Sequence, residues 1–341
     1  MIAYYVHHHG SGHLHRATSI AGHLGEDVVG ISSLDAPARW PGRWTTLPGD
    51  AEGVDAVHDD VSAGGTLHWT PRRHAGLRER MASVSAELRG GSVRLLVADV
   101  SVEIALLARL HGVPVVVVAQ PGRRTDRAHR TAYDLADAII APWPRRPAPD
   151  WPREWLAKTA HVGAFSRFDD RPASPATARQ EVLVLWGKGG LAVSETQLHA
   201  AAAATPEWHW HIAGPPTSGK ALGPHPSNLH HHGWVDDPWP LLGEAGVVVT
   251  HAGQNALAEV AAARRPAVVI PQPRPFDEQE ATAAALVGAD LGVVVPTWPE
   301  PHRWSTVLTD ARSRGGDWSP WSRGDGAARA AAVLRDLARH R

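Results

Sequence analysis

Apolar and polar positions in the first half of the chain alternate in blocks that predict strands followed by helices. Runs of apolar, mostly β-branched or aromatic residues stand at 2–6, 93–98, 113–119 and 138–141. Segments 16–24 and 102–110 have helical composition between such runs. Strands without polar alternation that are separated by helices are typical of a parallel sheet covered on both faces. The first half therefore predicts an α/β domain.

The same pattern restarts in the second half. Strands are predicted at 182–186, 208–213, 247–249 and 267–270, with further short segments at 229–233 and 240–242, and helices at 195–204 and after 253. Prolines and paired arginines between 142 and 152 cannot extend a helix or a strand, so we place the interdomain region at 142–170. A final helix is predicted at 326–341, where apolar residues recur at helical spacing.

Length and composition set limits on these domains and on function. A chain of 341 residues with 43% apolar content supports two cores, which we assign to 1–150 and 151–325. A net charge of −1 provides no basic surface for nucleic acid. The absence of cysteine excludes disulfides and thiolate metal sites. With no signal peptide and no apolar run of about 18 residues, the sequence predicts a cytoplasmic protein.

Two polar motifs in the second half follow predicted strands. Val247–Val249 runs into a Thr-His-Ala-Gly turn and then a helix rich in alanine and leucine, so the free N–H groups at the helix start could hold a phosphate. Asp277, Glu278 and Gln279 follow the strand at 267–270 and a proline-rich loop. Carboxylate and amide oxygens in this cluster suit the hydroxyl groups of a sugar.

Together these motifs resemble the donor-sugar signature of GT-B nucleotide-sugar glycosyltransferases, in particular the MurG-like and UDP-glycosyltransferase-like branches with a family 28 type of C-terminal domain. The resemblance implies an α/β fold of two Rossmann-like domains whose parallel sheets face each other across a cleft. It also implies that the final helix crosses back to the N-terminal domain. A nucleotide-diphosphate sugar, most often a UDP-sugar, would be the co-substrate, with no other cofactor.

The resemblance assigns roles to residues of the second half. The diphosphate would be bound by Gly187, Lys188, Gly189, Gly190, His251, Gly253, Gln254 and Asn255. Glu259 would bind the ribose, Asp277, Glu278 and Gln279 the donor sugar, and Trp234 the nucleobase. Simpler explanations are a buried structural role for His251, a charged helix start at 277–279, and ordinary packing of one among 15 tryptophans. The short glycine-rich loop at 187–190 is weak evidence by itself and is not a Walker A sequence. Ala252 stands where relatives carry a second glycine, which puts the details of phosphate contact in question.

The loop after the first strand is the predicted acceptor side. Gly10, Ser11 and Gly12 would let the backbone approach a ligand closely, although a tight strand-helix turn explains the glycines equally well. His13 is the candidate general base for an acceptor hydroxyl. Asp99, at the end of another strand, would orient its ring as in the His and Asp dyad of UDP-glycosyltransferases. The alternative is that Asp99 caps the helix that begins near Val102.

Histidine-rich stretches invite a metal interpretation that we do not adopt. Consecutive residues on a strand point to alternate faces, so at most two members of 7–9 or of 230–232 could share an ion. No His-Glu-x-x-His spacing accompanies them, and GT-B enzymes generally work without an essential metal. The segment 64–74 lies where acceptor loops occur in this fold, and its Arg72 and Arg73 could meet an anionic acceptor or be solvated.

The sequence therefore predicts an inverting glycosyltransferase that moves a sugar onto a small-molecule or lipid-linked hydroxyl acceptor, with peripheral membrane contact at most. One alternative is a nucleotide-sugar hydrolase or 2-epimerase on the same fold. The other is an inactive nucleotide-sugar-binding scaffold. Measurable turnover of a nucleotide sugar would exclude the scaffold. Release of free sugar without an acceptor would indicate the hydrolase.

Overall fold

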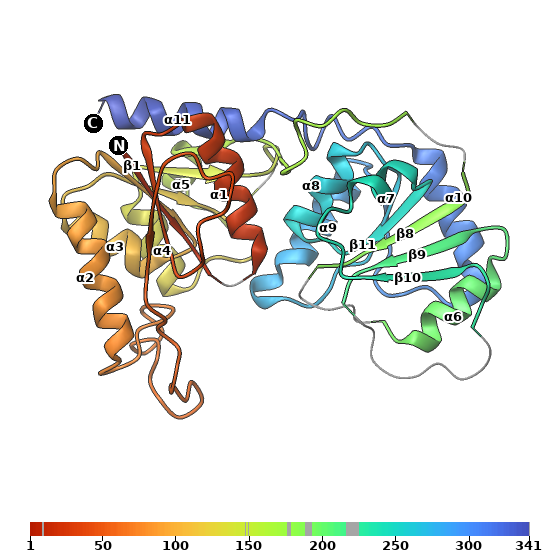
Figure 1. Cartoon of the computed structure of the whole chain (residues 1–341), viewed down its shortest axis with the longest axis horizontal. Coiled ribbons are helices and arrows are strands. Elements are labelled where there is room, and N and C mark those ends of the chain that lie inside the picture. Colours follow the sequence, from red (N-terminus) through yellow and green to blue (C-terminus); the bar gives the residue numbers. More distant parts are fainter. Residues whose placement is uncertain are drawn as a thin grey trace. The chain divides into compact units, whose positions relative to one another are not determined.

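The computed structural model describes residues 1–8, 10–146, 148, 150–175, 179–187, 193–215 and 225–340. The chain separates into two compact units, Met1–Gly163 with Asp325–Arg341 (unit 1) and Ala164–Gly324 (unit 2). Each unit contains one sheet in which all neighbouring strands run parallel, with helices along it (Figure 1). The α/β class with two Rossmann-like domains, expected from the sequence, is confirmed.

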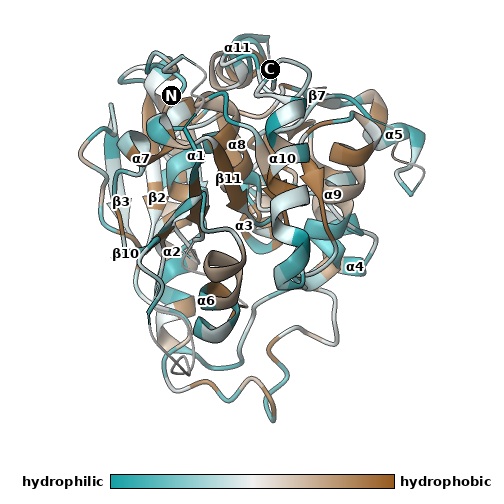
Figure 2. Ribbon diagram, turned by 90° about the vertical axis from the view of Figure 1, so that its right-hand side faces the viewer, coloured by the Kyte–Doolittle hydropathy of each residue, from teal (hydrophilic) through white to brown (hydrophobic). Residues whose placement is uncertain are grey.

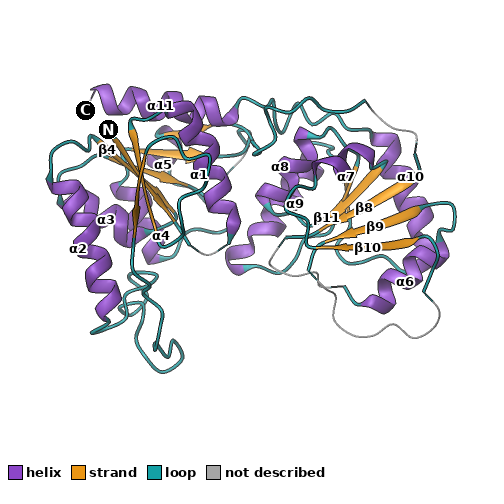
Figure 3. Cartoon of the chain, viewed as in Figure 1, coloured by secondary structure: helices purple, strands orange, loops and turns teal. Residues whose placement is uncertain are grey.

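Unit 1 is built on a seven-stranded sheet of order β3-β2-β1-β4-β5-β6-β7. Its strands are β1 (Ile2–Val6), β2 (Val28–Ser32), β3 (Arg43–Thr46), β4 (Leu95–Asp99), β5 (Val115–Val118), β6 (Ala138–Ala141) and β7 (Thr159–His161). Its helices are α1 (Ser11–Leu24), α2 (Ala75–Arg89), α3 (Val102–Leu110), α4 (Arg127–Leu135), α5 (Arg153–Ala157) and α11 (Gly326–His340). Figure 3 shows these helices flanking the strands.

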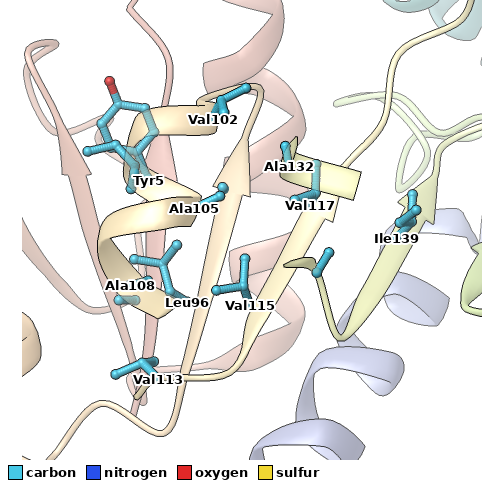
Figure 4. Close-up of a cluster of buried hydrophobic side chains, with 14 of the residues drawn as sticks. Tyr5, Leu96, Val102, Ala105, Ala108, Val113, Val115, Val117, Ala132 and Ile139 are labelled. Carbon is cyan, nitrogen blue, oxygen red and sulfur yellow. The ribbon is translucent and has the colours of Figure 1, made fainter. Parts of the chain in front are cut away.

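The core of unit 1 forms where small helical residues meet branched strand residues. Leu96 of β4 and Val115 of β5 pack with Ala105 and Ala108 of α3 in one buried cluster (Figure 4). Because alanine leaves room for the neighbouring valines and leucines, α3 can lie close to the sheet. All five residues of β4 are buried, which is why this strand lacks polar alternation.

Unit 2 is built on a six-stranded sheet of order β10-β9-β8-β11-β12-β13. Its strands are β8 (Glu181–Leu185), β9 (His209–Ala213), β10 (Leu229–Gly233), β11 (Val247–Thr250), β12 (Ala267–Val269) and β13 (Val293–Val294). Its helices are α6 (Glu195–Ala204), α7 (Trp239–Glu244), α8 (Gln254–Ala262), α9 (Glu278–Gly288), α10 (Trp304–Arg314) and the 3-10 turns η1 (Pro275–Asp277) and η2 (Pro301–Arg303).

Buried clusters cover both faces of the unit 2 sheet. Val248 of β11 packs with Leu257 of α8, whereas its neighbour Val249 packs with Leu198 of α6 and Leu308 of α10. Successive residues of a strand point to opposite faces, so β11 is apolar from Val247 to Val249, and the hydroxyl of its buried last residue, Thr250, donates to the backbone oxygen of Leu185. In Figure 2 this strand is brown, while the surface helix α4 of unit 1 is mostly teal.

Several elements differ from the sequence-based prediction. Helix α1 begins at Ser11 and not at residue 16, and β2, β3, α2 and α4 were not predicted. The region 142–170, expected to be a linker, contains α5 and β7. The boundary between units therefore falls after Gly163 and not after residue 150. The reason is that β7 consists of three residues, Thr-Ala-His, which are too few for a recognisable strand pattern but still pair with β6.

Helix α11 packs on α1 within unit 1. Ala330, Ala331 and Leu334 are buried on its inner face. Arg335 Nη1 also donates a hydrogen bond of 2.7 Å to the backbone oxygen of His23 at the end of α1. Helix α11 therefore belongs to unit 1, although it follows unit 2 in the sequence. Among the residues that the structure describes, no helix has both the length and the apolar composition to cross a lipid bilayer.

Candidate active site

The candidate residues of unit 1 lie where the strand order of its sheet reverses. β1 and β4 are neighbours at this switch point, and the chain leaves them in opposite directions toward β2 and β5. Parallel sheets bind ligands outside the carboxyl ends of the strands at such points. His13 follows β1, and Asp99 is the last residue of β4. The topology thus brings together residues that are 86 positions apart.

The turn after β1 explains how His13 reaches this edge. Gly10 has a φ of 80°, a left-handed conformation that favours glycine, and α1 starts at the next residue. Ser11, Gly12 and His13 are therefore the first turn of α1, and not a loop ahead of it as predicted. His9 lies outside the described residues.

His13 and Asp99 are in direct contact, as the sequence hypothesis requires. The distance from His13 Nδ1 to Asp99 Oδ1 is 2.9 Å, with the Asp99 side chain fully buried and the His13 side chain 15% exposed. The alternative role of Asp99 as a helix cap is wrong, because the side chain of Ser101 accepts the N–H of Ile104 at the start of α3. The carboxylate is therefore available to the histidine.

Arg16 completes this cluster, and the sequence reasoning missed it. Its Nε donates to Asp99 Oδ2 at 3.2 Å, and its Nη2 donates to Oδ1. Arg16 Nη2 also lies 3.0 Å from His13 Nδ1. The spacing of three residues, which places Arg16 and His13 on one helix face, was hidden while α1 was expected to begin at residue 16. Knowing where the helix begins would have revealed Arg16.

Charge compensation keeps Asp99 ionised. Burial by itself raises the pKa of this carboxyl, but the charges of Arg16 and His13 and their hydrogen bonds outweigh burial and lower the pKa to about 2. An ionised Asp99 accepts hydrogen bonds only. When His13 Nδ1 donates its proton to Asp99, Nε2 of the neutral ring carries a lone pair that can accept a proton from a ligand.

The candidate residues of unit 2 also lie at a switch point, between β8 and β11. Gly187 stands two residues after β8, and His251 directly follows β11. The predicted phosphate ligands Lys188, Gly189 and Gly190 lie outside the described residues. Gln254 and Asn255 are the first two residues of α8, and both are partly buried. The helix start that the sequence placed at Gly253 is confirmed.

His251 is held in one tautomer by the start of α8. The N–H of Gly253 donates to His251 Nδ1 at 2.9 Å, so Nδ1 of the neutral ring is unprotonated and Nε2 carries the hydrogen. Burial, together with the charge of Arg274, lowers the pKa of His251 to about 4 and keeps the ring neutral near pH 7. Nε2 is directed toward the carboxyl end of β8, where a Cβ on Gly187 would lie 3.7 Å from it.

Gly253 is needed for space and not for its backbone conformation. Its φ of −76° and ψ of 141° suit any residue. An added Cβ, however, would lie 2.3 Å from Cε1 and 2.6 Å from Nδ1 of His251. Glycine at this position therefore allows the imidazole to lie against the helix start.

Gln279 connects the two loops of the donor side. Its Oε1 accepts the N–H of Ala252 at 3.1 Å and that of Gln272 at 2.9 Å, and its Nε2 lies 3.2 Å from His251 Nδ1. The side chain is 3% exposed. The structure thus gives Gln279 a positioning role within the protein, which differs from the direct sugar contact that we predicted for it.

The first of the two acidic residues before Gln279 lies in a strained turn, and the second follows it. Phe276 and Asp277 have φ values of 63° and 53°, which are uncommon for residues other than glycine and cost free energy. Asp277 precedes the first residue of α9, Glu278, and both are partly buried. Strained backbone is common at ligand sites, so this turn is consistent with the predicted sugar contact.

Glu259 has a partner that the sequence did not reveal. Arg167, in the segment that opens unit 2, donates from Nε to Glu259 Oε1 at 2.9 Å. The Glu259 side chain is only 12% exposed. Burial raises the pKa of Glu259, and Arg167 opposes this rise. No sequence motif links the two residues, which are 92 positions apart.

Trp234 lies at the end of β10, apart from the core. Its side chain is 46% exposed, and its Nε1 donates to Asp236 Oδ1 at 2.7 Å. An indole that is almost half exposed at the end of a strand is suited to stacking on a nucleobase.

Comparisons with known proteins agree with this geometry. Residues 226–314, which include Trp234, His251, Glu259 and Gln279, match the model of the glycosyltransferase family 28 C-terminal domain. The chain has the fold of the kitacinnamycin glycosyltransferase, with a TM-score of 0.70, 18% identity and 98% of each chain covered. It also has the fold of Acinetobacter baumannii MurG, with a TM-score of 0.63, 16% identity and coverage of 98% and 99%. The protein is therefore a glycosyltransferase of the GT-B type.

Curated relatives cover most of the chain. One is the UDP-N-acetylglucosamine–N-acetylmuramyl-(pentapeptide) pyrophosphoryl-undecaprenol N-acetylglucosamine transferase of Clavibacter sepedonicus, 29% identical over 93% of this chain and 94% of its own length. Another is an uncharacterized glycosyltransferase of Methanopyrus kandleri, 27% identical over 77% of this chain and 82% of its own.

Replacing Asp99 tests the buried charge cluster. We expect Asp99→Asn to lower the free energy of unfolding by about 3–5 kcal/mol near pH 7, because Arg16 loses its counter-charge. A carboxyl with a depressed folded-state pKa stabilises above its unfolded pKa of about 4, and this contribution is lost as pH falls toward 2. Urea unfolding of both proteins at several pH values would measure the difference, which should shrink below pH 4. A difference that stays constant down to pH 3 would contradict the assignment.

Gly253→Ala tests the packing of His251. The added methyl group overlaps the imidazole, so we expect a loss of about 1–3 kcal/mol in unfolding free energy. Gly288→Ala is a matched control, because nothing lies within 4 Å of its added Cβ at the end of α9. Urea unfolding at pH 7 is the measurement. Equal stability of the two variants would show that His251 does not lie against Gly253.

Proposed function

We propose that the protein transfers a sugar from a UDP-sugar to a hydroxyl acceptor with inversion at the anomeric carbon, and that His13 is the general base. The observation that carries this proposal is the 2.9 Å contact between His13 and the buried, ionised Asp99 at the switch point of unit 1. A histidine oriented by a carboxylate is suited to removing a proton from a hydroxyl group.

The reaction is a single displacement in this proposal. His13 Nε2 takes the proton of the acceptor hydroxyl as the acceptor oxygen bonds to the anomeric carbon and the bond from that carbon to the diphosphate oxygen breaks. Asp99 stabilises the imidazolium that forms, and Arg16 keeps Asp99 ionised. The groups at the start of α8 balance the negative charge that grows on the leaving diphosphate.

The leaving diphosphate would meet two kinds of donor in unit 2. The N–H groups at the start of α8 and the helix dipole favour an anion. His251, neutral near pH 7 with its hydrogen on Nε2, adds a side-chain donor directed toward the end of β8. Because these groups stabilise the negative charge, we propose that the transfer needs no essential metal ion.

Other residues of unit 2 would bind the ribose, the base and the sugar of the donor. In the proposal Glu259, held by Arg167, accepts hydrogen bonds from the ribose hydroxyls, and Trp234 stacks on the base. Asp277 and Glu278 bind the sugar, while Gln279 positions the loop that carries them. UDP is the proposed nucleotide because the relative from Clavibacter sepedonicus is named for a UDP-sugar.

The acceptor we propose is a small diffusible molecule. The connection between β3 and α2 leaves the carboxyl edge of the unit 1 sheet, the same edge as His13. Its exposed residues include the acidic Glu52, Asp55, Asp59 and Asp60, against the basic Arg72 and Arg73, so acidic side chains predominate. Negative charge at this edge would be repelled by an anionic membrane, which disfavours a lipid-linked acceptor such as the undecaprenol compound in the relative's name.

The location that we propose is the cytoplasm. The absence of cysteine from the chain fits this reducing compartment.

Thermal unfolding with UDP, TDP, GDP and their sugar conjugates tests the donor site. A ligand at about 100 times its Kd adds roughly 2.7 kcal/mol, which raises the midpoint by several degrees. We expect UDP and UDP-sugars to give this shift in the wild type and Glu259→Ala to abolish it. Glu244→Ala, on an exposed side chain of α7, should respond like the wild type. If no nucleotide shifts the wild-type midpoint, the donor site is wrong.

Turnover by His13→Ala tests the base. Loss of a general base lowers kcat by about 100- to 10,000-fold, whereas the shift with UDP should remain because His13 does not contact the donor in this proposal. His23→Ala, an exposed histidine on the same helix, is the matched control. UDP release with a panel of hydroxyl acceptors, and with water alone, is the measurement. Near wild-type turnover by His13→Ala would exclude its role, and acceptor-independent release would indicate the hydrolase.

A further inference from the structure

A second group of polar side chains in unit 2 lies on the edge of the sheet formed by β9 and β10. Glu195 is the first residue of α6, and His199 follows one helical turn later. His225 precedes β10, and His231 lies within it. Leu198 of α6 and Leu229 of β10 share one buried cluster, so α6 covers the face of β10 to which His231 belongs. The fold thus assembles four residues from three segments.

The donor atoms of this group are spaced like the ligands of one ion. Glu195, His199 and His225 each offer one atom, and these three atoms lie within 4.8 Å of one another. The distance is 3.2 Å from His199 Nε2 to Glu195 Oε1 and 3.3 Å from His199 Nε2 to His225 Nδ1. Tetrahedral zinc, with bonds of about 2.0 Å to nitrogen and oxygen, separates neighbouring donors by about 3.3 Å. Both distances match this value.

Outer contacts orient two of these donors. His225 Nε2 lies 2.9 Å from the backbone oxygen of Leu229, which can only accept a hydrogen bond. Nε2 therefore carries the hydrogen, and Nδ1, the atom that faces His199, has a lone pair. His231 Nε2 lies 2.9 Å from Glu195 Oε1 and holds the carboxylate in place. Hydrogen bonds from a ligand histidine to a backbone carbonyl, and from a neighbour to a ligand carboxylate, are typical of metal sites in proteins.

A comparable group in unit 1 lacks this spacing. His68, Asp126 and His129 also offer atoms within 4.8 Å of one another. His129 Nδ1, however, is only 2.6 Å from Asp126 Oδ2, which is a hydrogen bond and too short for two ligands of one zinc ion. In the unit 2 group, the distances from His199 Nε2 to Glu195 and to His225 are 3.2 and 3.3 Å, and neither is this short.

We propose that Glu195, His199 and His225 bind a zinc-class divalent cation, with His231 as the positioning residue for Glu195. Two imidazoles and a carboxylate are a zinc donor set that leaves a coordination position for water. The ion would join the first turns of α6 to the segment that enters β10. Its role is to stabilise unit 2, so it is separate from the sugar transfer and does not depend on the proposed function. The sequence argument against metal considered 7–9 and 230–232 and did not include Glu195, His199 or His225.

Zinc binding to the full-length protein without an affinity tag tests this site. After chelator treatment and its removal, titration with Zn²⁺ against a competing indicator should give one tight site in the wild type and raise the thermal midpoint by a few degrees. Glu195→Gln and His225→Ala should each weaken binding more than about 100-fold, and His231→Ala by about 10- to 100-fold. Each variant's midpoint without zinc shows whether it is folded.

The control is the double variant His209→Ala and His230→Ala. These two exposed histidines stack with each other on strands β9 and β10, and His230 points to the opposite face from His231. The control should retain the wild-type zinc affinity and thermal shift. Equal zinc binding by the wild type and His225→Ala would overturn the proposal, and so would loss of the site in the control or absence of a tight site in the wild type. His225 is exposed and outside any helix or strand, so its variant should fold normally.

Discussion

The contact on which unit 1 depends is the one between Arg16 and Asp99. A carboxylate with no solvent exposure is stable only if its charge is compensated, and Arg16 does this with two of its nitrogens. The contact fixes the rotation of α1 about its axis, because Arg16 must point to the end of β4. That rotation brings His13 to the same carboxylate. The structural requirement of burying Asp99 and the chemical requirement of orienting a base are therefore met by one arrangement of three side chains.

The two units use the same topological position in different ways. Unit 1 places an ionised group at its switch point and compensates it with a cation. Unit 2 places a neutral histidine and the uncharged start of α8 at the corresponding point. An anionic ligand would be repelled by a bare carboxylate but accepted by backbone N–H groups. The two units share a fold but differ in the groups at their switch points. The groups in unit 1 are suited to moving a proton, and those in unit 2 are suited to binding a diphosphate.

Much of this could be predicted from the sequence, and the failures have physical reasons. Apolar runs identified β1, β4, β5, β8 and β11, because strands buried on both faces leave no other pattern. The pair His13 and Asp99 followed from the rule that ligands bind at the carboxyl edge, together with the resemblance to the His and Asp dyad of UDP-glycosyltransferases. Arg16 and Arg167 were missed because arginines are frequent in this chain and only the three-dimensional contact singles them out. β7 was missed because it has three residues, and its place in the sheet comes from pairing with β6.

The packing of α11 on α1 gives the chain an unusual order of assembly. Unit 2 is continuous in sequence, whereas unit 1 is divided, with its last helix encoded after the whole of unit 2. As the chain leaves the ribosome, unit 2 can therefore fold from a complete set of its own residues. Unit 1 must wait for the final segment, although it is synthesised first. The helix that carries His13 and Arg16 is thus made before unit 2, but it acquires its full packing only when α11 has followed unit 2.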